Sequence, residues 1–325
     1  MTKKTMIAAL AATVAMTALG SMTAFAEGRV LKFGHVNGET HPINQAALKM
    51  AEILEEKTEG RFTMDVYANS ALGGERDLIE GVQMGAVDLC YTAATPLGNY
   101  VPELMVTDLP FLITDQDHAN AVYYGEIGDE LKGYVDNSGL KALTFVDIGF
   151  RNVGLVSKPV ASAADLEGIK IRTMENELHL EAWRALGADP VPMSFGDAFT
   201  AFQQGAIDAL EMTNTHLVAN GVADVMKYYA ETKHIYTPGL ILISPFLWDS
   251  LSEEDQQIFM EAALEARDLN NELNTQMEEE NKQVIADKGV EMAVVDQAEL
   301  QEKVQSVYEN HPEFNEMVEK IRNAK

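Results

Sequence analysis

Two arginines stand out because each follows an apolar segment, where a solvated surface arginine is not expected. Arg172 ends the alternating run 169–172, and Arg151 ends the run 147–151. A guanidinium presents paired N–H donors whose spacing matches a carboxylate. Both side chains are therefore candidates for binding an organic acid. The alternative that the residues leave open is a buried ion pair with one of the many acidic side chains.

The segment around Arg172 predicts the elements that position it. A strand at 169–172 is followed by a helical pattern, a proline-marked loop, a second helix at 197–204 and a strand at 206–212. Ligands of open α/β sheets bind outside the carboxyl ends of the strands, which is where Arg172 falls. Phe195, on the proline-flanked loop, either closes over an apolar part of the ligand or packs in the core.

Strand and helix signals alternate along the rest of the chain, which predicts the α/β class. Further strands are expected at 30–36, 62–67, 87–91, 140–146, 153–156 and 290–295, and helices follow Pro42, follow Arg76 and span 118–135. The segments 147–151 and 227–245 are expected to cross between two domains. The predicted domains comprise residues 27–148 with 238–278, and residues 149–237 with 279–325.

A long helix is predicted from Ser252 to about Lys288, beyond the usual length of globular helices. Its expected apolar side consists of Ile258, Ala262, Ala266, Leu269, Leu273 and Met277. No heptad pattern continues it as a coiled coil, so we expect this helix to lie along both domains.

A short internal repeat supports two similarly built halves. Gln83–Asp88 recurs as Gln203–Asp208, and in each copy a helix stops at a glycine before a buried strand begins. The match alone is weak enough to arise by chance, but both copies share the same flanking pattern. The repeat predicts that Tyr91–Thr92 and Glu211–Met212 lie at matching strand ends and face each other across a cleft.

The formal net charge is −27. A field this negative disfavours binding of nucleic acid and anionic lipid. It also repels an anionic small molecule at long range. An acidic ligand must therefore be held by local arginines inside a closed cleft.

The N-terminal residues 1–26 have the pattern of a secretory signal peptide. Lys3 and Lys4 precede an uncharged apolar run, and Ala24–Ala26 forms an A-x-A cleavage site. The run is short for a membrane anchor. Cys90 is the only cysteine, so we expect neither a lipid-modified cysteine nor a disulfide. The expected mature protein begins at Glu27 and is periplasmic.

Motifs of the common enzyme classes are absent. The sequence has no G-x-S-x-G, no H-E-x-x-H and no phosphate-binding glycine loop. The histidines do not pair at metal-ligand spacing, although His35 and His41 flank an early loop where a ligand could reach them. Cys90 lies in an apolar strand and is expected in the core. We therefore expect no catalytic residue, metal or cofactor.

Six ordered motifs resemble the periplasmic solute-binding proteins of tripartite ATP-independent periplasmic (TRAP) transporters, the DctP-type family. Each motif is weak alone, but their order and spacing are specific and cover nearly the whole mature chain. They lie at residues 33–35 with 41–42, 72–76, 149–151, 165–172, 185–193 and 203–208.

The resemblance implies a periplasmic-binding-protein-like fold, with two α/β domains, crossing strands and a long helix, that closes on an organic acid in the interdomain cleft. Arg172 matches the family arginine that forms the main salt bridge to the ligand carboxylate, and Arg151 matches a second arginine that assists. The remaining expected ligand-binding residues are His35, Asn37, Glu75, Thr92, Glu175, Phe195, Glu211, Met212, Thr213 and Asn214.

One position departs from the family pattern. Many members carry an asparagine that contacts the ligand where this chain has Met212, and Ala209 replaces a glycine in the same strand. Methionine makes the pocket less polar than an amide would. We therefore expect a less hydroxylated carboxylate rather than a sugar acid such as sialic acid.

The function expected from the resemblance is that of a monomeric, non-catalytic receptor. It would capture a monocarboxylate or dicarboxylate and deliver it to the small and large membrane subunits of a TRAP transporter driven by an ion gradient. One alternative is a periplasmic enzyme acting on an organic acid, which turnover of the ligand would reveal. Another is a binding protein that feeds a signalling receptor, which neighbouring genes for membrane subunits would argue against.

Overall fold

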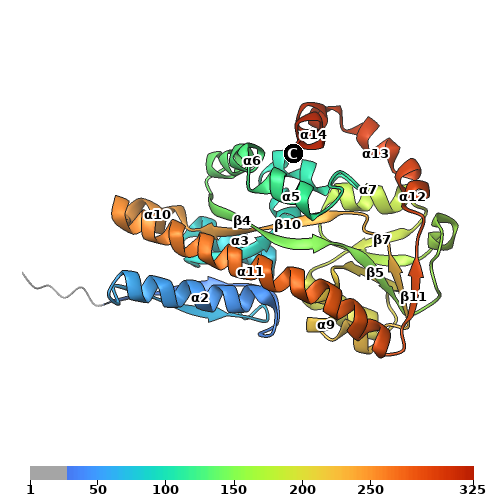
Figure 1. Cartoon of the computed structure of the whole chain (residues 1–325), viewed down its shortest axis with the longest axis horizontal. Coiled ribbons are helices and arrows are strands. Elements are labelled where there is room, and N and C mark those ends of the chain that lie inside the picture. The colour runs from blue at the N-terminus through green and yellow to red at the C-terminus, as the bar shows by residue number, and fades with distance from the viewer. Residues whose placement is uncertain (1–27) are drawn as a thin grey trace, which may run out of the picture.

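The computed structural model describes residues 28–325, so the predicted signal peptide and its cleavage site lie outside the described residues. The chain forms two mixed β-sheets flanked by helices (Figure 1). This arrangement confirms the predicted α/β class. Within residues 28–325, no helix is both long and apolar enough to cross a membrane.

The first sheet has five strands. Their spatial order is β2 (Phe62–Tyr67), β1 (Arg29–Gly34), β3 (Leu89–Ala93), β10 (Tyr236–Ile243) and β4 (Lys141–Phe150). The first three strands run parallel, whereas β10 is antiparallel to both of its neighbours.

The second sheet has six strands. Their order is β11 (Glu291–Val294), β9 (Tyr228–Glu231), β5 (Asn152–Leu155), β8 (Ala209–Met212), β6 (Lys170–Thr173) and β7 (Asp189–Pro192). Strand β5 is antiparallel to β8 and β9, and the other neighbouring strands pair in parallel.

Helices cover both sheets and fill the connections between strands. The α-helices are α2 (Pro42–Lys57), α3 (Glu75–Met84), α4 (Ala94–Leu97), α5 (Gln116–Tyr123), α6 (Glu126–Asn137), α7 (Glu177–Ala185), α8 (Phe195–Gln203), α9 (Asn214–Ala219), α10 (Pro245–Ser250), α11 (Glu253–Asp287), α12 (Gln297–Lys303), α13 (Gln305–Asn310) and α14 (Asn315–Arg322). The 3-10 helices are η1 (Pro102–Asp108), η2 (Ala163–Leu166), η3 (Val222–Asp224) and η4 (Pro312–Phe314).

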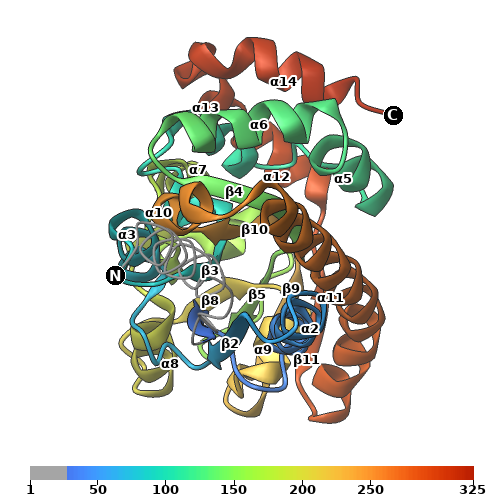
Figure 2. The ribbon, with the colours of Figure 1, turned by 90° about the vertical axis from the view of Figure 1, so that its left-hand side faces the viewer.

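Alternate residues of the first sheet enter two different cores, because successive side chains of a strand point to opposite faces. Leu89 and Ile241 pack on one face with α2 and α11, which lie side by side (Figure 2). Cys90 packs on the other face with α3 and, as predicted, is buried in the core. This second core continues through Trp183 of α7 into the second sheet, so apolar packing joins the two halves.

The two copies of the repeat adopt the same local structure. Gly85 and Gly205 follow α3 and α8 in the left-handed conformation, with φ of 75° and 70°, which glycine adopts without a Cβ penalty. Oδ2 of Asp88 accepts a hydrogen bond from the backbone N–H of Lys32, and Oδ2 of Asp208 accepts one from Lys170, each at 3.0 Å. Each aspartate thereby fixes the neighbouring parallel strand.

Two predictions of secondary structure are wrong. The helix predicted over 118–135 is broken into α5 and α6, because Gly125 has an extended backbone, with φ of −107° and ψ of −164°, and caps the start of α6. The segment containing Pro190 and Pro192, expected as a loop, forms the edge strand β7. An edge strand tolerates proline because one of its sides needs no ladder donor.

The strand β4, which leads from the first sheet to the second, is held by asparagines of α11. The pairing of β4 with β10 shifts register beside Pro238, and proline has no N–H to donate. Nδ2 of Asn270 donates to the Asp147 carbonyl, and Nδ2 of Asn274 donates to the Ile148 carbonyl, each at 3.0 Å. The two side chains supply donors where the strand ladder is irregular.

Helix α11 begins after the predicted cap Ser252 and runs for 35 residues along both sheets (Figure 1). Its predicted apolar side is wrong beyond Ala266. Leu269, Leu273 and Met277 are only partly buried, whereas the buried positions of this half include Asn270, Asn274 and Asn281. The reason is that the helix leaves the apolar face of the first sheet and meets the polar backbone of the crossing strand.

The C-terminal helices return to the first sheet's helices (Figure 2). The Tyr308 hydroxyl donates to the carbonyl of Pro110 at 2.7 Å, and Lys320 pairs with Glu130 at 2.9 Å. The C-terminal segment thus bridges both halves. The domain boundaries placed at 148/149, 237/238 and 278/279 stay predictions.

Replacing Asn274 with alanine tests the role of the asparagines. We expect the free energy of unfolding to fall by about 1–3 kcal/mol, because the Ile148 carbonyl loses its buried donor. Urea denaturation of the ligand-free protein measures this loss. The exposed neighbour Thr275 is the control, and Thr275→Ala is expected to change stability by less than about 0.5 kcal/mol. Equal effects of the two substitutions would contradict the assignment.

Candidate functional site

A cavity lies between the two sheets, at the carboxyl ends of β3, β6 and β8. Its volume is about 30 Å³, and it adjoins an outer chamber of about 270 Å³ that shares Glu75, Arg172 and Phe195. The inner cavity is lined by Val36, Asn37, Glu75, Tyr91, Ala93, Ile148, Arg151, Arg172, Met174, Phe195, Met212 and His216. The strand ends that the repeat predicted to face each other contribute Tyr91 and Met212 to this cavity.

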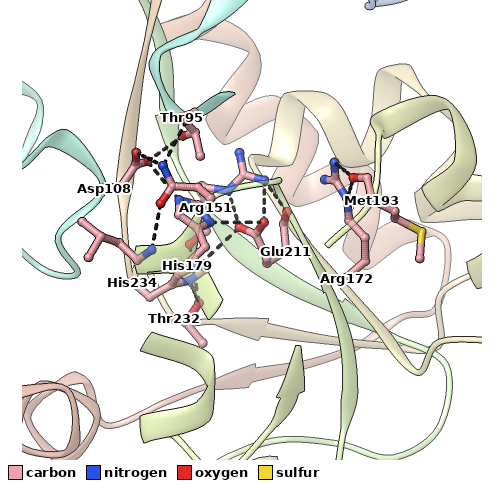
Figure 3. A network of polar contacts seen from close by, with 11 residues as sticks. Thr95, Asp108, Arg151, Arg172, His179, Met193, Glu211, Thr232 and His234 are labelled. Atoms are coloured by element: carbon pink, nitrogen blue, oxygen red, sulfur yellow. Dashed lines mark hydrogen bonds and ion pairs between the residues drawn. The ribbon is translucent and has the colours of Figure 1, made fainter. Parts of the chain in front are cut away.

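Arg151, at the crossing from β4 to β5, is locked by Glu211 of β8 (Figure 3). Its Nε donates to Oε2 of Glu211, and its Nη2 donates to Oε1 at 2.9 Å. Arg151 is 4% exposed and Glu211 is fully buried. Burial would raise the pKa of Glu211, but Arg151, His234 and His179 together outweigh burial and hold that pKa well below its ordinary value. Glu211 is therefore an ionised partner that orients the guanidinium.

The same ion pair belongs to a buried network that joins the two halves of the molecule (Figure 3). Nε2 of His234 lies 3.4 Å from Oε2 of Glu211, and Nδ1 of His179 lies 3.9 Å from Oε1. Nε2 of His179 lies 3.0 Å from Oδ1 of Asp108, which also accepts a hydrogen bond from Thr95 at 2.6 Å. Asp108 and Thr95 belong to η1 and α4, beside the first sheet, so the network ties Glu211 of the second sheet to them.

Arg172, in β6, is held differently. Its Nε and Nη2 donate to the backbone carbonyl of Met193 at 3.0 and 2.7 Å, which fixes the guanidinium without neutralising it (Figure 3). The side chain is buried, and burial lowers the pKa of Arg172 to about 10, so it stays charged at neutral pH. Within residues 28–325, neither Arg151 nor Arg172 has a hydrogen bond on Nη1.

Glu75 is the first residue of α3 and lines both the cavity and the outer chamber. Its Oε1 accepts hydrogen bonds from the backbone N–H of Ala93 at 2.7 Å and from the Thr92 hydroxyl at 3.4 Å. Burial raises the pKa of Glu75, although Arg172 and Arg151 act in the opposite direction. A carboxyl group thus shares the cavity with both guanidiniums.

The structure divides the predicted ligand-binding residues into two groups. Those that line the cavity are Asn37, Glu75, Arg151, Arg172, Phe195 and Met212, and Glu175 lines the outer chamber. The others are bonded to neighbouring residues and do not line the cavity: His35, Thr92, Glu211, Thr213 and Asn214. Among these, Thr213 caps α9 and contacts His216, and Asn214 accepts from Tyr229.

Two polar residues of the cavity, Tyr91 and His216, were not among the expected ligand-binding residues, although the repeat predicted that Tyr91 faces the cleft. Room for the Tyr91 ring depends on Gly239, where a Cβ would lie 2.6 Å from it. The Tyr91 hydroxyl and Oδ1 of Asn37 are buried, and neither has a partner within residues 28–325. Both residues could have been predicted from their positions relative to the strands. The repeat placed Tyr91 at the end of a strand, and His216 lies in the first turn of the helix that follows β8.

Comparisons with known proteins agree with this architecture. Residues 33–315 match the family described as bacterial extracellular solute-binding protein, family 7 (DctP). A solute-binding protein of Verminephrobacter eiseniae is 35% identical over 280 residues, which is 84% of this chain and 83% of that protein.

Two solved structures are similar over most of the chain. A TRAP periplasmic solute-binding protein from Polaromonas, bound to D-erythronate, has a TM-score of 0.89 and 33% identity and covers 91% of this chain and 99% of its own. A sugar acid binding protein from Advenella mimigardefordensis, in complex with galactonate, has a TM-score of 0.89 and 27% identity. It covers 92% of this chain and 98% of its own. The chain therefore belongs to the bacterial extracellular solute-binding proteins of family 7, the DctP family of TRAP transporter solute-binding proteins.

Proposed function

We propose that this protein is an extracytoplasmic receptor that binds an organic acid between its two sheets, with the ligand carboxylate on Arg172 and Arg151. The observation that carries the proposal is a pair of buried guanidiniums in one cavity, each with an Nη1 group that has no hydrogen-bond partner in residues 28–325. Arg151 is neutralised by Glu211, whereas Arg172 donates only to an uncharged carbonyl. Arg172 is therefore the principal carboxylate-binding residue, and Arg151 assists.

The rest of the cavity suits a ligand with an apolar part. Val36, Ile148, Met174, Phe195 and Met212 line it together with the polar groups. A thioether accepts hydrogen bonds only weakly, so Met212 gives little to a sugar hydroxyl. This supports a smaller, less hydroxylated acid than a sugar acid with a hydroxyl on every carbon.

The ligand would pass to the membrane subunits of a TRAP transporter. Membership of a family made up of solute-binding proteins supports a receptor rather than an enzyme. The same membership supports a periplasmic location, reached through cleavage of the signal peptide after Ala26, and the protein would act as a monomer. Recovery of chemically unchanged ligand from the purified protein tests the receptor role, because an enzyme would release product.

His216 contributes no positive charge to the site at neutral pH. Burial, together with the charges of Arg151 and Arg172, lowers the pKa of His216 to about 3. Its Nδ1 lies 2.8 Å from the Thr213 hydroxyl. The attraction for an anion therefore comes from the arginines alone, and His216 acts as a neutral polar group in the cavity wall.

Replacing Arg172 with alanine tests the carboxylate-binding role. A ligand at one hundred times its Kd stabilises the wild type by about 2.7 kcal/mol, and Arg172→Ala should abolish this stabilisation. Thermal shift in the presence of D-erythronate and other organic acids measures it, with circular dichroism to show that the fold persists. Arg184→Ala, on an exposed part of α7, is the matched control. Unchanged affinity in the Arg172 variant would remove the proposed ligand contact.

Replacing Met212 with asparagine tests the preference for less hydroxylated acids. The wild type should bind D-erythronate more tightly than D-galactonate, and Met212→Asn should shift this ratio toward galactonate by about tenfold, as one good buried hydrogen bond allows. Isothermal titration calorimetry gives both Kd values. Tighter wild-type binding of galactonate than of erythronate would count against the role of Met212.

Replacing His216 with asparagine tests the electrostatics through pH. Because the pKa of His216 is lower in the folded protein than the ordinary 6.5, only the unfolded chain takes up this proton as pH falls from 6.5 toward 3. The wild type therefore loses stability over this range, by as much as about 1.4 kcal/mol per pH unit from this group. His216→Asn should flatten the dependence in urea denaturation measured across this range.

His311 provides the control for this pH dependence. Burial would lower its pKa, but ion pairs with Glu313 and Glu181 outweigh burial and raise it. Its contribution to stability is complete below the ordinary pKa and is lost as pH rises through the raised value. His311→Asn should therefore remove the stability that the wild type gains as pH falls through the raised pKa toward 6.5, and should leave the slope below pH 6.5 unchanged. A flattened slope below pH 6.5 in this variant would contradict the assignment.

A further inference from the structure

The charges around the cavity leave room for one negative group on the ligand. Arg151 is already paired with the fully buried carboxylate of Glu211. Arg172 donates only to the carbonyl of Met193 and keeps its charge unpaired. Glu75 faces the same cavity from α3. One ligand carboxylate therefore balances Arg172, and a second would meet an acidic wall.

The outer chamber does not offer a second positive site. Three acidic side chains line it in addition to Glu75, namely Asp77, Glu175 and Asp197. Arg76 also lines the chamber, but its guanidinium pairs with Glu80 at 3.1 Å. A ligand that extends from Arg172 into this chamber would thus place its far end among carboxylates.

The groups that remain unpaired near Glu75 suit uncharged hydroxyls. The Tyr91 hydroxyl and Oδ1 of Asn37 are buried without partners in the described part of the chain, and both residues line the cavity. Oε1 of Glu75 is occupied by the Ala93 N–H, which leaves Oε2 to accept from a ligand. Buried polar groups of this kind are normally satisfied by a ligand or water.

We propose that Glu75 restricts this receptor to acids with a single carboxylate, whose far end carries a hydroxyl that donates to Glu75. The inference rests on the proposed function and narrows it, because the arginines alone would admit monocarboxylates and dicarboxylates alike. A hydroxyl replaces the water that a desolvated Glu75 loses. A carboxylate at the same place leaves two like charges facing each other with little water between them, which is costly.

The experiment uses pairs of acids that differ only at the far carbon. D-erythronate ends in a CH₂OH group where meso-tartrate has a second carboxylate. D-galactonate and galactarate form a longer pair that differs in the same way. Kd values for all four acids are measured by calorimetry at about pH 8, well above the ordinary carboxyl pKa range. We expect the wild type to bind the monocarboxylate of each pair at least tenfold more tightly than the diacid. Repulsion between like charges that shifts a pKa by about one unit corresponds to a tenfold change in an equilibrium constant.

Glu75→Gln keeps the shape of the side chain and removes its charge. We expect this variant to lower the preference for the monocarboxylate by about tenfold, mainly through tighter binding of the diacid. Glu55→Gln is the matched control, because Glu55 is an exposed glutamate of helix α2 that lies outside both chambers. This control should keep the wild-type preference.

The possible results separate the two proposals. Equal or tighter wild-type binding of a diacid, or a preference that Glu75→Gln leaves unchanged, overturns the role of Glu75 while binding through Arg172 stands. Failure of every organic acid to bind, or binding that survives Arg172→Ala, overturns the proposed function and this inference with it. Collapse of the preference in Glu75→Gln but not in Glu55→Gln supports the inference.

Discussion

The buried ion pair between Arg151 and Glu211 is the interaction on which the site depends. A charge in an apolar interior is tolerated only when it is paired and hydrogen-bonded, and Glu211 gives Arg151 both a counter-charge and a fixed orientation. His179 extends the same contact to Asp108 beside the first sheet. The guanidinium of Arg151 is therefore held by a network that spans both halves of the molecule, and contacts within the protein set its geometry.

Helix α11 gives this network a rigid support. Its asparagines hold the backbone of the crossing strand, and one turn further along, Glu278 accepts hydrogen bonds from the N–H groups of Asn214 and Thr215 at the start of α9. A carboxylate at a helix N-terminus complements the helix dipole. Through α9 the helix also fixes the wall that carries His216. The polar half of α11 thus holds the backbone around the candidate site, whereas its apolar half packs in the core of the first sheet.

Patterns in the sequence predicted the fold where hydrophobic period and glycine position agreed. The repeat identified two similar halves, and the alternation before Arg172 placed it at a carboxyl strand edge, because both signals are local. The sequence did not distinguish the residues that line the cavity from the residues that hold them in place. Glu211 and Thr213 come from the same short segment as Met212. Tertiary geometry turns Glu211 toward Arg151, whereas Thr213 contacts His216 as the local cap of α9. The asparagines of α11 were missed because their partners are backbone carbonyls of a strand more than a hundred residues away.

The acidic outer chamber also has a kinetic consequence. A carboxylate that approaches Arg172 through it passes Asp77, Glu175 and Asp197 on a protein whose net charge is −27. At 0.1 M salt, interactions between exposed charges are largely screened beyond a Debye length of about 10 Å, whereas a buried contact such as the one proposed with Arg172 is screened much less. If the ligand binds as proposed, the association rate constant should increase with ionic strength while the dissociation rate constant changes little. The receptor would then load faster in salt water than in fresh water and would hold a bound acid equally long in both.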